Sequence, residues 1–196
     1  MQAQIIDQRP VQSSSDWLKK YYFVRFAFSA AWVAVAFTAA KNEPALAAVM
    51  LVAYPAWDAA ANFVDGQRTG GLGQNKSQLL NFIVSAITAV AVAVALGKSM
   101  NAVLDVFAAW AVLAGVFQLA TAMRRWKSAG AQWAMALSGG QSALVGGFFA
   151  KMAAGAAPVG IANIAPYAAF GAFYFLVSAV WLAVGDVRRS SARAAS

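Results

Sequence analysis

The sequence predicts an all-α membrane protein: a bundle of six transmembrane helices built from three tandem helical hairpins, with both termini in the cytoplasm. Two observations carry this prediction. Of the 196 residues, 61% are hydrophobic and 11% are charged, and the mean hydropathy is +0.60. A single soluble core of this size cannot hide so much apolar surface. The chain also holds six stretches of the roughly 20 apolar residues that a helix needs to cross a bilayer core about 30 Å thick.

Charge, Gly, Pro or Asn bounds each of these stretches. Runs such as AITAVAVAVAL are apolar on all sides, whereas the strands of a porin-like barrel alternate polar and apolar residues. We therefore expect a helical domain over 18–186, between cytoplasmic polar tails at 1–17 and 187–196 that stay mobile unless a partner orders them. The crossings are expected near 21–40, 45–65, 78–97, 101–123, 131–152 and 161–185.

The distribution of Lys and Arg predicts the orientation. Eleven of these residues fall on one side of the predicted bundle, and Lys41, Lys98 and Lys151 fall on the other. The positive-inside bias places the richer side, with both termini and the loops 66–77 and 124–130, in the cytoplasm of a bacterial inner membrane. Because the net charge of +8 is spread over four segments, it favours anionic lipid headgroups over nucleic acid as the partner.

An internal repeat is visible in the odd-numbered helices. They align as RFAFSAAWVAVA, NFIVSAITAVAV and SGGQSALVGGFF, with Ser29, Ser85 and Ser142 in register at spacings of 56 and 57 residues. The even-numbered helices echo one another more weakly. A constant spacing of this kind indicates a repeated unit, here a hairpin that returns the chain to the same side. The three hairpins are expected over about 18–68, 76–125 and 130–186.

Small residues and a mid-helix glycine mark the stretch FAAWAVLAGVFQLATAMRRWKSAGAQWAMALSGGQSALVGGFF. Its apolar helix, basic loop, Trp and second helix opening on Gly-Gly resemble the HdeD-like family of small bacterial membrane proteins, the acid-resistance family built from three two-helix repeats. The resemblance covers roughly 20–185 and implies a role in envelope stress resistance. It carries over no catalytic residue, and the charged Arg25 and the Asn62 of helix two depart from the family pattern.

Charged side chains inside the membrane must be paired, lie near an interface, or line water. By helical rise Arg25 lies about 6 Å deep and Asp58 about 10 Å deep. We expect an ion pair between them, with Asn62 one turn nearer the cytoplasm on the same face. Two alternatives stay open: a cytoplasm-facing polar cavity or proton path, and an unpaired Arg25 that reaches the interface. Further candidate polar contacts, expected to join helices, are Asn81, Gln118 and Gln141.

Other polar and aromatic residues have structural interpretations. Asp105 is expected to cap helix four, in preference to forming a pore mouth. Trp57, Trp110 and Phe170 recur at similar points of the even helices and are expected to pack as an aromatic layer rather than as a cofactor cage. An interfacial aromatic belt is expected from Trp17, Tyr21, Tyr22, Trp126 and Trp133.

The sequence lacks the residues that common catalytic sites need. It has no Cys and no His, and no nucleotide loop, metal-ligand cluster or catalytic carboxylate pair. We therefore expect no enzyme, cofactor or metal. The first hypothesis is a structural, accessory or stress-resistance membrane protein, as a subunit of a larger membrane complex or as a homo-oligomer. The alternative is a small channel or transporter for protons or small solutes through a polar path near Asp58.

Overall fold

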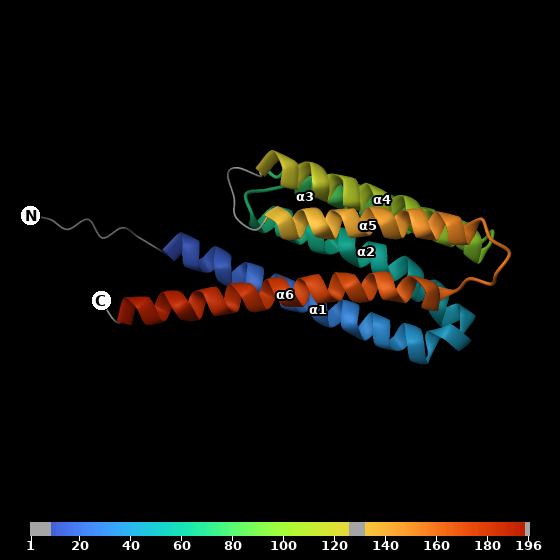
Figure 1. Cartoon of the computed structure of the whole chain (residues 1–196), viewed down its shortest axis with the longest axis horizontal. Helices are drawn as coiled ribbons and strands as arrows, with labels where there is room; N and C mark the ends of the chain where they lie inside the picture. Colours follow the sequence, from blue (N-terminus) through green and yellow to red (C-terminus); the bar gives the residue numbers. More distant parts are fainter. Residues whose placement is uncertain (1–8, 126–131, 195–196) are drawn as a thin grey trace, which may run out of the picture. The chain divides into compact units, whose positions relative to one another are not determined.

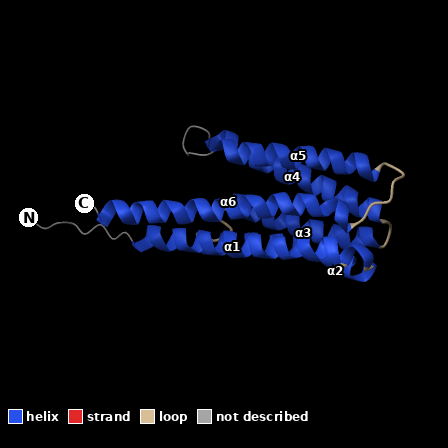
Figure 2. Cartoon of the chain, turned by 60° about the horizontal axis from the view of Figure 1, so that its bottom comes forward, coloured by secondary structure: helices blue, strands red, loops and turns tan. Residues whose placement is uncertain are grey.

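The computed structural model describes residues 9–125 and 132–194, and within these ranges the chain is helical and contains no strand (Figures 1 and 2). The all-helical prediction is therefore confirmed for the described residues. The elements are α1 (Arg9–Thr38), the short 3-10 helix η1 (Ala40–Asn42), α2 (Pro44–Arg68), α3 (Lys76–Leu96), α4 (Met100–Arg125), α5 (Gln132–Ala153) and α6 (Ile161–Ala194).

Five of these helices contain a segment long and apolar enough to cross a membrane, which makes the chain a multi-pass membrane protein. The sixth predicted crossing, 131–152, coincides with the 22-residue helix α5. Among the described residues this helix is not one of the five, so its crossing stays a prediction. The five segments are Asp16–Thr38, Pro44–Arg68, Lys76–Leu96, Met100–Ala120 and Ile161–Arg188.

The first and last helices are longer than the sequence analysis expected. Helix α1 already begins at Arg9 and α6 continues to Ala194, so residues 9–17 and 187–194 are helical. The mobility expected for the two ends of the chain stays a prediction. Pro10 lies in the first turn, where a missing backbone N–H breaks no helical hydrogen bond, and no Gly or Pro follows Asp186 to stop α6.

Local signals explain the turn between α2 and α3. The hydroxyl of Thr69 donates to the backbone oxygen of Asp65 at 2.7 Å, which satisfies a carbonyl at the end of α2. Gly70 and Gly71 have φ angles of 101° and 90°, a conformation that suits glycine. The side chain of Asn75 then caps α3 by accepting from the backbone N–H of Gln78 at 3.3 Å.

The chain forms two compact units. The terminal unit consists of Met1–Ala30 and Ala169–Ser196, and the internal unit consists of Ala31–Ala168. Within the terminal unit, α1 and α6 run antiparallel (Figure 1). Lys19 forms an ion pair with Asp186, while the rings of Tyr22 and Phe175 stack with centroids 6.4 Å apart. Going along α1 from Lys19 to Tyr22, the contacts on α6 move backward from Asp186 to Phe175, as expected for antiparallel helices.

Within the internal unit, the most extensive helix contact joins α4 to α5, and the next joins α2 to α3. Glycines permit the close approach of α4 and α5. A Cβ atom added to Gly139 would lie 2.8 Å from the backbone oxygen of Gly115, and one added to Gly146 would lie 2.7 Å from the oxygen of Ala108. Gly140 and Gly147, on another face of α5, would meet nothing within 4 Å. Two of the four glycines of α5 thus serve helix packing in this unit.

Candidate functional site

The carboxylate of Asp58 lies at the contact between α2 and α3. Its Oδ2 atom accepts a hydrogen bond from the hydroxyl of Ser85 at 2.7 Å and another from the side-chain amide of Asn62 at 2.9 Å. The same amide also donates to the backbone oxygen of Asp58 at 2.8 Å. Asn62 is 5% exposed, so its polar atoms are bonded where solvent is excluded. The structure brings Asn62 to Asp58, as the sequence predicted, and adds Ser85 from α3.

A second bond extends this cluster to α4. The indole N–H of Trp110 donates to the hydroxyl oxygen of Ser85 at 3.1 Å. A serine hydroxyl has one donor and two lone pairs, so Ser85 can donate to Asp58 and accept from Trp110 at the same time. Asp58, Ser85 and Trp110 therefore form a continuous hydrogen-bonded line across α2, α3 and α4.

A separate polar pair joins the last helices of the internal unit. The hydroxyl of Ser142 donates to the backbone oxygen of Ala111 at 3.1 Å and lies 2.9 Å from the hydroxyl of Tyr167. Because the single proton of Ser142 is used on Ala111, the Tyr167 hydroxyl is the donor in the second bond. This pair connects α5 to α4 and to the start of α6.

The two serine bonds share a sequence relationship. Ser85 and Trp110 are 25 residues apart, and so are Ser142 and Tyr167. Ser29 and Tyr54 have the same spacing in the sequence. The same spacing recurs among core residues of the even-numbered helices. Fully buried residues stand at intervals of 56 and 57 positions, namely Leu51, Phe107 and Ile164.

Trp110 contacts two other aromatic residues of the internal unit. Its ring lies 6.0 Å from that of Tyr54 and 6.4 Å from that of Tyr167, measured between centroids. Phe170 belongs to the terminal unit, so the layer expected from Trp57, Trp110 and Phe170 stays a prediction. The rings of Tyr54 and Trp32 are also in contact, with centroids 4.8 Å apart. The indole N–H of Trp32 donates to the backbone oxygen of Met50 at 2.9 Å.

Arg25 has its described contacts inside the terminal unit. Its guanidinium donates to the hydroxyl of Tyr21 at 2.9 Å and lies 4.2 Å from the centroid of the Phe175 ring, a cation–π geometry. Asp58 belongs to the internal unit, whose position relative to the terminal unit is not determined. The ion pair between Arg25 and Asp58 therefore stays a prediction.

The other predicted polar residues lie at separate places in the internal unit. Gln118 is exposed, and its Cβ lies beside Gly139 at the contact of α4 with α5. Asn81 and Gln141 are half-buried on α3 and α5. The polar residues that do line up with Asp58 are Ser85 and Trp110. Ser85 was noted only as a repeat marker, and the signal that could have identified its partner is the aromatic residue 25 positions later.

Two further expectations concern the ends of helices. Asp105 does not cap α4, because that helix begins at Met100 and the hydroxyl of Ser99 accepts from the backbone N–H of Ala102 at 3.1 Å. In the aromatic belt, Tyr21 contacts both Trp17 and Tyr22, at 6.2 and 5.5 Å between centroids. Trp126 and the side chain of Trp133 lie outside the described residues. In residues 9–125 and 132–194, the Asp and Glu side chains form no group of three that could hold a metal ion.

Comparison with known proteins gives one finding about the family. Residues 83–151 match a family model described as "Short repeat of unknown function (DUF308)", the family of the HdeD-like proteins. The matched residues run from α3 through α4 to the end of α5 and include Ser85, Trp110 and Ser142. No curated protein and no solved structure matches the chain. The chain is thus similar to this repeat family over its middle part.

Proposed function

We propose that this chain is a non-enzymatic, six-crossing protein of the bacterial inner membrane with a structural or accessory role. Both termini lie in the cytoplasm, and its task is envelope stress resistance, as in the HdeD-like family it resembles, or service as a subunit of a larger membrane complex. The observation that carries the proposal is that polar side chains in the helices form hydrogen bonds from one helix to another. These side chains are Asp58, Ser85, Trp110, Ser142 and Tyr167.

Hydrogen bonding of this kind favours a structural role over a solute path. A polar group in an apolar medium is costly unless it is bonded, and bonds between helices hold a membrane bundle together. A path would instead need polar side chains that face open space. The groove between α2 and α3 is lined only by alanine, phenylalanine and valine, although Asp58 and Ser85 lie on these same two helices.

The three-hairpin organisation is part of this proposal. Its support is the pair of serine bonds that each span 25 residues and the burial of Leu51, Phe107 and Ile164 at equivalent positions. The hairpins of this arrangement are α1 with α2, α3 with α4, and α5 with α6. The contacts between successive hairpins, α2 with α3 and α4 with α5, then correspond to each other, and α6 with α1 is the third equivalent pair. Gln118 follows Asn62, and Asn81 follows Arg25, by the repeat spacing of 56 residues. Polar residues therefore occupy equivalent positions in successive hairpins.

The partners proposed are anionic lipid headgroups at the cytoplasmic basic segments and a larger membrane complex or a second copy; nucleic acid is not among them. The test is extraction of the protein from native membranes in mild detergent, followed by sizing and quantitative mass spectrometry of co-purifying chains. A stoichiometric protein partner, absent when an unrelated tagged membrane protein of similar size is purified, is the expected result for an accessory subunit. A chain that travels alone as a monomer would contradict the assembly role.

A small channel or transporter is the second candidate, favoured by the half-buried carboxylate of Asp58 within a membrane-crossing helix. In that case purified protein in liposomes conducts protons or small solutes, and Asp58→Asn abolishes the flux while the protein still folds and elutes as the wild type does. Flux that is equal in wild-type and empty liposomes would exclude this function for the solutes tested.

A further inference from the structure

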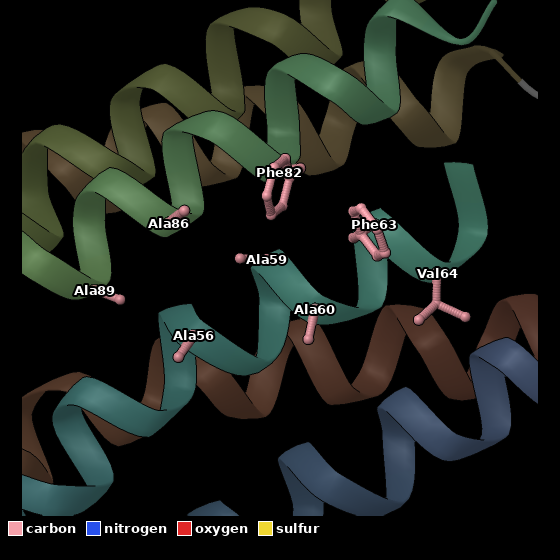
Figure 3. Close-up of a pocket in the computed structure, with 8 residues that line it drawn as sticks. All are labelled: Ala56, Ala59, Ala60, Phe63, Val64, Phe82, Ala86 and Ala89. Carbon is pink, nitrogen blue, oxygen red and sulfur yellow. The ribbon is translucent and has the colours of Figure 1, made fainter. Parts of the chain in front are cut away.

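An apolar groove opens between α2 and α3, in the part of both helices that crosses the membrane. The groove is open along its side and has a volume of about 530 Å³, and Figure 3 shows side chains of both helices along it. Phe63 and Phe82 lie across it from one another, with ring centroids 5.4 Å apart. The remaining lining residues have small apolar side chains, so no polar side chain lines the groove. They are Ala56, Ala59, Ala60, Val64, Ala86 and Ala89.

The internal comparison with α4 and α5 shows why the groove exists. When the chain is shifted by 57 residues, Phe82 falls on Gly139 and Ala89 falls on Gly146. Those two glycines let α5 touch the backbone of α4, so that an added Cβ would clash. At the same positions α3 presents a phenyl ring and a methyl group, and these larger side chains hold it away from α2. The groove is therefore a specific difference between two otherwise corresponding helix pairs.

Charge at one end of the groove indicates what enters it. Arg68 ends α2 and Lys76 begins α3, and both side chains are exposed at the same end of the pair. By helical rise, Arg68 lies roughly 6 Å beyond Val64 and Lys76 roughly 9 Å beyond Phe82. Cations one to two turns outside an apolar groove match the order of phosphate, glycerol and acyl chain in a phospholipid. Each cation near an anionic membrane surface contributes about 1 kcal/mol.

We propose that the groove between α2 and α3 binds one anionic phospholipid, with an acyl chain along Ala60 and Ala86 and the phosphate at Arg68 and Lys76. The inference rests on the membrane placement and the anionic-lipid partner proposed above, and it holds whether the chain is an accessory protein or a channel. A single acyl chain is apolar and narrow, and hydrocarbon is the solvent at this depth. Anionic rather than zwitterionic lipid is selected because the exposed charged groups Arg68 and Lys76 are cations. The carboxylate of Asp65 at the same end is buried and accepts a hydrogen bond from the side-chain amide of Gln78.

The test is native mass spectrometry of the delipidated full-length protein, titrated in detergent with phosphatidylglycerol or with phosphatidylethanolamine of the same acyl chains. Wild type is expected to bind one phosphatidylglycerol at least tenfold more tightly than phosphatidylethanolamine. Ala86→Leu fills the groove and is expected to weaken binding of both lipids at least tenfold. Ala91→Leu is the matched control, since Ala91 is equally half-buried on α3 but lies on another face.

The headgroup site has its own control pair. Lys76→Gln is expected to remove the preference for phosphatidylglycerol, whereas Lys98→Gln, at the other end of α3, keeps it. Unchanged lipid binding by the Ala86→Leu variant would overturn the proposal. If this variant also changed the oligomeric size of the protein, the groove would be assigned to contact with a second copy of the chain. If Ala86→Leu does not fold, a photoreactive phosphatidylglycerol crosslinked to wild type decides the matter: labelling within residues 56–64 or 82–89 supports the site, and labelling only elsewhere overturns it.

Discussion

The hydroxyl of Ser85 lies 2.7 Å from the carboxylate of Asp58, and this contact joins α3 to α2 inside the membrane-crossing part of both helices. The same hydroxyl accepts the indole N–H of Trp110 from α4. One small side chain therefore serves three helices at once. Two partners, a carboxylate and an indole N–H, depend on it for a hydrogen bond.

Ser85→Ala is expected to lower the free energy of unfolding by about 1 kcal/mol, because two polar groups lose a partner where water is scarce. The measurement is a thermal or denaturant unfolding curve in detergent. Ser178→Ala is the control, since the hydroxyl of Ser178 donates only to the backbone oxygen of Tyr174 within its own helix. Equal stability of the two variants would show that Ser85 does not hold α2, α3 and α4 together.

Gly139→Ala and Gly147→Ala are expected to have opposite effects. The new methyl at position 139 would lie 2.8 Å from a backbone oxygen of α4 and forces α5 outward, at a cost of roughly 1–3 kcal/mol. At position 147 nothing lies within 4 Å, and the gain in helix propensity is roughly 0.5–1 kcal/mol. Unfolding curves measure both. A destabilised Gly147→Ala with an unaffected Gly139→Ala would reverse the assignment of the packed face of α5.

The antiparallel pairing of α1 with α6 can be tested by crosslinking, because the chain contains no cysteine of its own. The double variant Tyr22→Cys with Phe175→Cys is expected to react with a short bifunctional thiol reagent, since the native rings stack at 6.4 Å. Tyr22→Cys with Phe173→Cys is the control, because Phe173 is exposed on another face of α6. Protease cleavage between the helices followed by gel electrophoresis reads the result. Equal crosslinking of both pairs speaks against a fixed register.

The proposed orientation predicts which loops face the cytoplasm. Gly73→Cys lies between α2 and α3, and Lys98→Cys lies between α3 and α4. A membrane-impermeant maleimide is expected to label Lys98→Cys from the periplasmic side of intact cells and to reach Gly73→Cys only after permeabilisation. The opposite pattern would invert the topology, and labelling of both cysteines from one side would remove the crossing by α3.

The sequence predicted the helices well and the contacts less well, for physical reasons. Long apolar runs have few alternatives in lipid, so the membrane-crossing segments follow from hydropathy. The serine register was visible because a hydroxyl stands out among alanines. The aromatic contacts of Trp110 were not visible, since Tyr54, Trp57, Tyr167 and Phe170 all offer rings within one turn and only packing selects among them. A loop within 66–77 was predicted, whereas its turn at Gly70 and Gly71 and the helical ends beyond 17 and 186 were missed.

Packing also explains why the groove escaped sequence analysis. The glycines of α5 were conspicuous, but their meaning depends on which face meets α4. Phe82 is one phenylalanine among 13 and gives no local sign that it holds two helices apart. The difference between Phe82 and Gly139 is informative only when both are known to occupy the same place in corresponding helix pairs.

The length of α6 has a mechanical consequence. Its 34 residues extend roughly 51 Å at helical rise, against a hydrocarbon layer about 30 Å thick. Its one proline, Pro166, lies near the helix start, and sharp bends in helices usually need proline or a comparable break. The remaining length is therefore expected to behave as a single rod that is longer than the hydrocarbon layer is thick. We expect a protein that binds the C-terminal end of α6 and tilts it to tilt the whole helix, because the ion pair between Lys19 and Asp186 is the kind of contact that ties this end to α1.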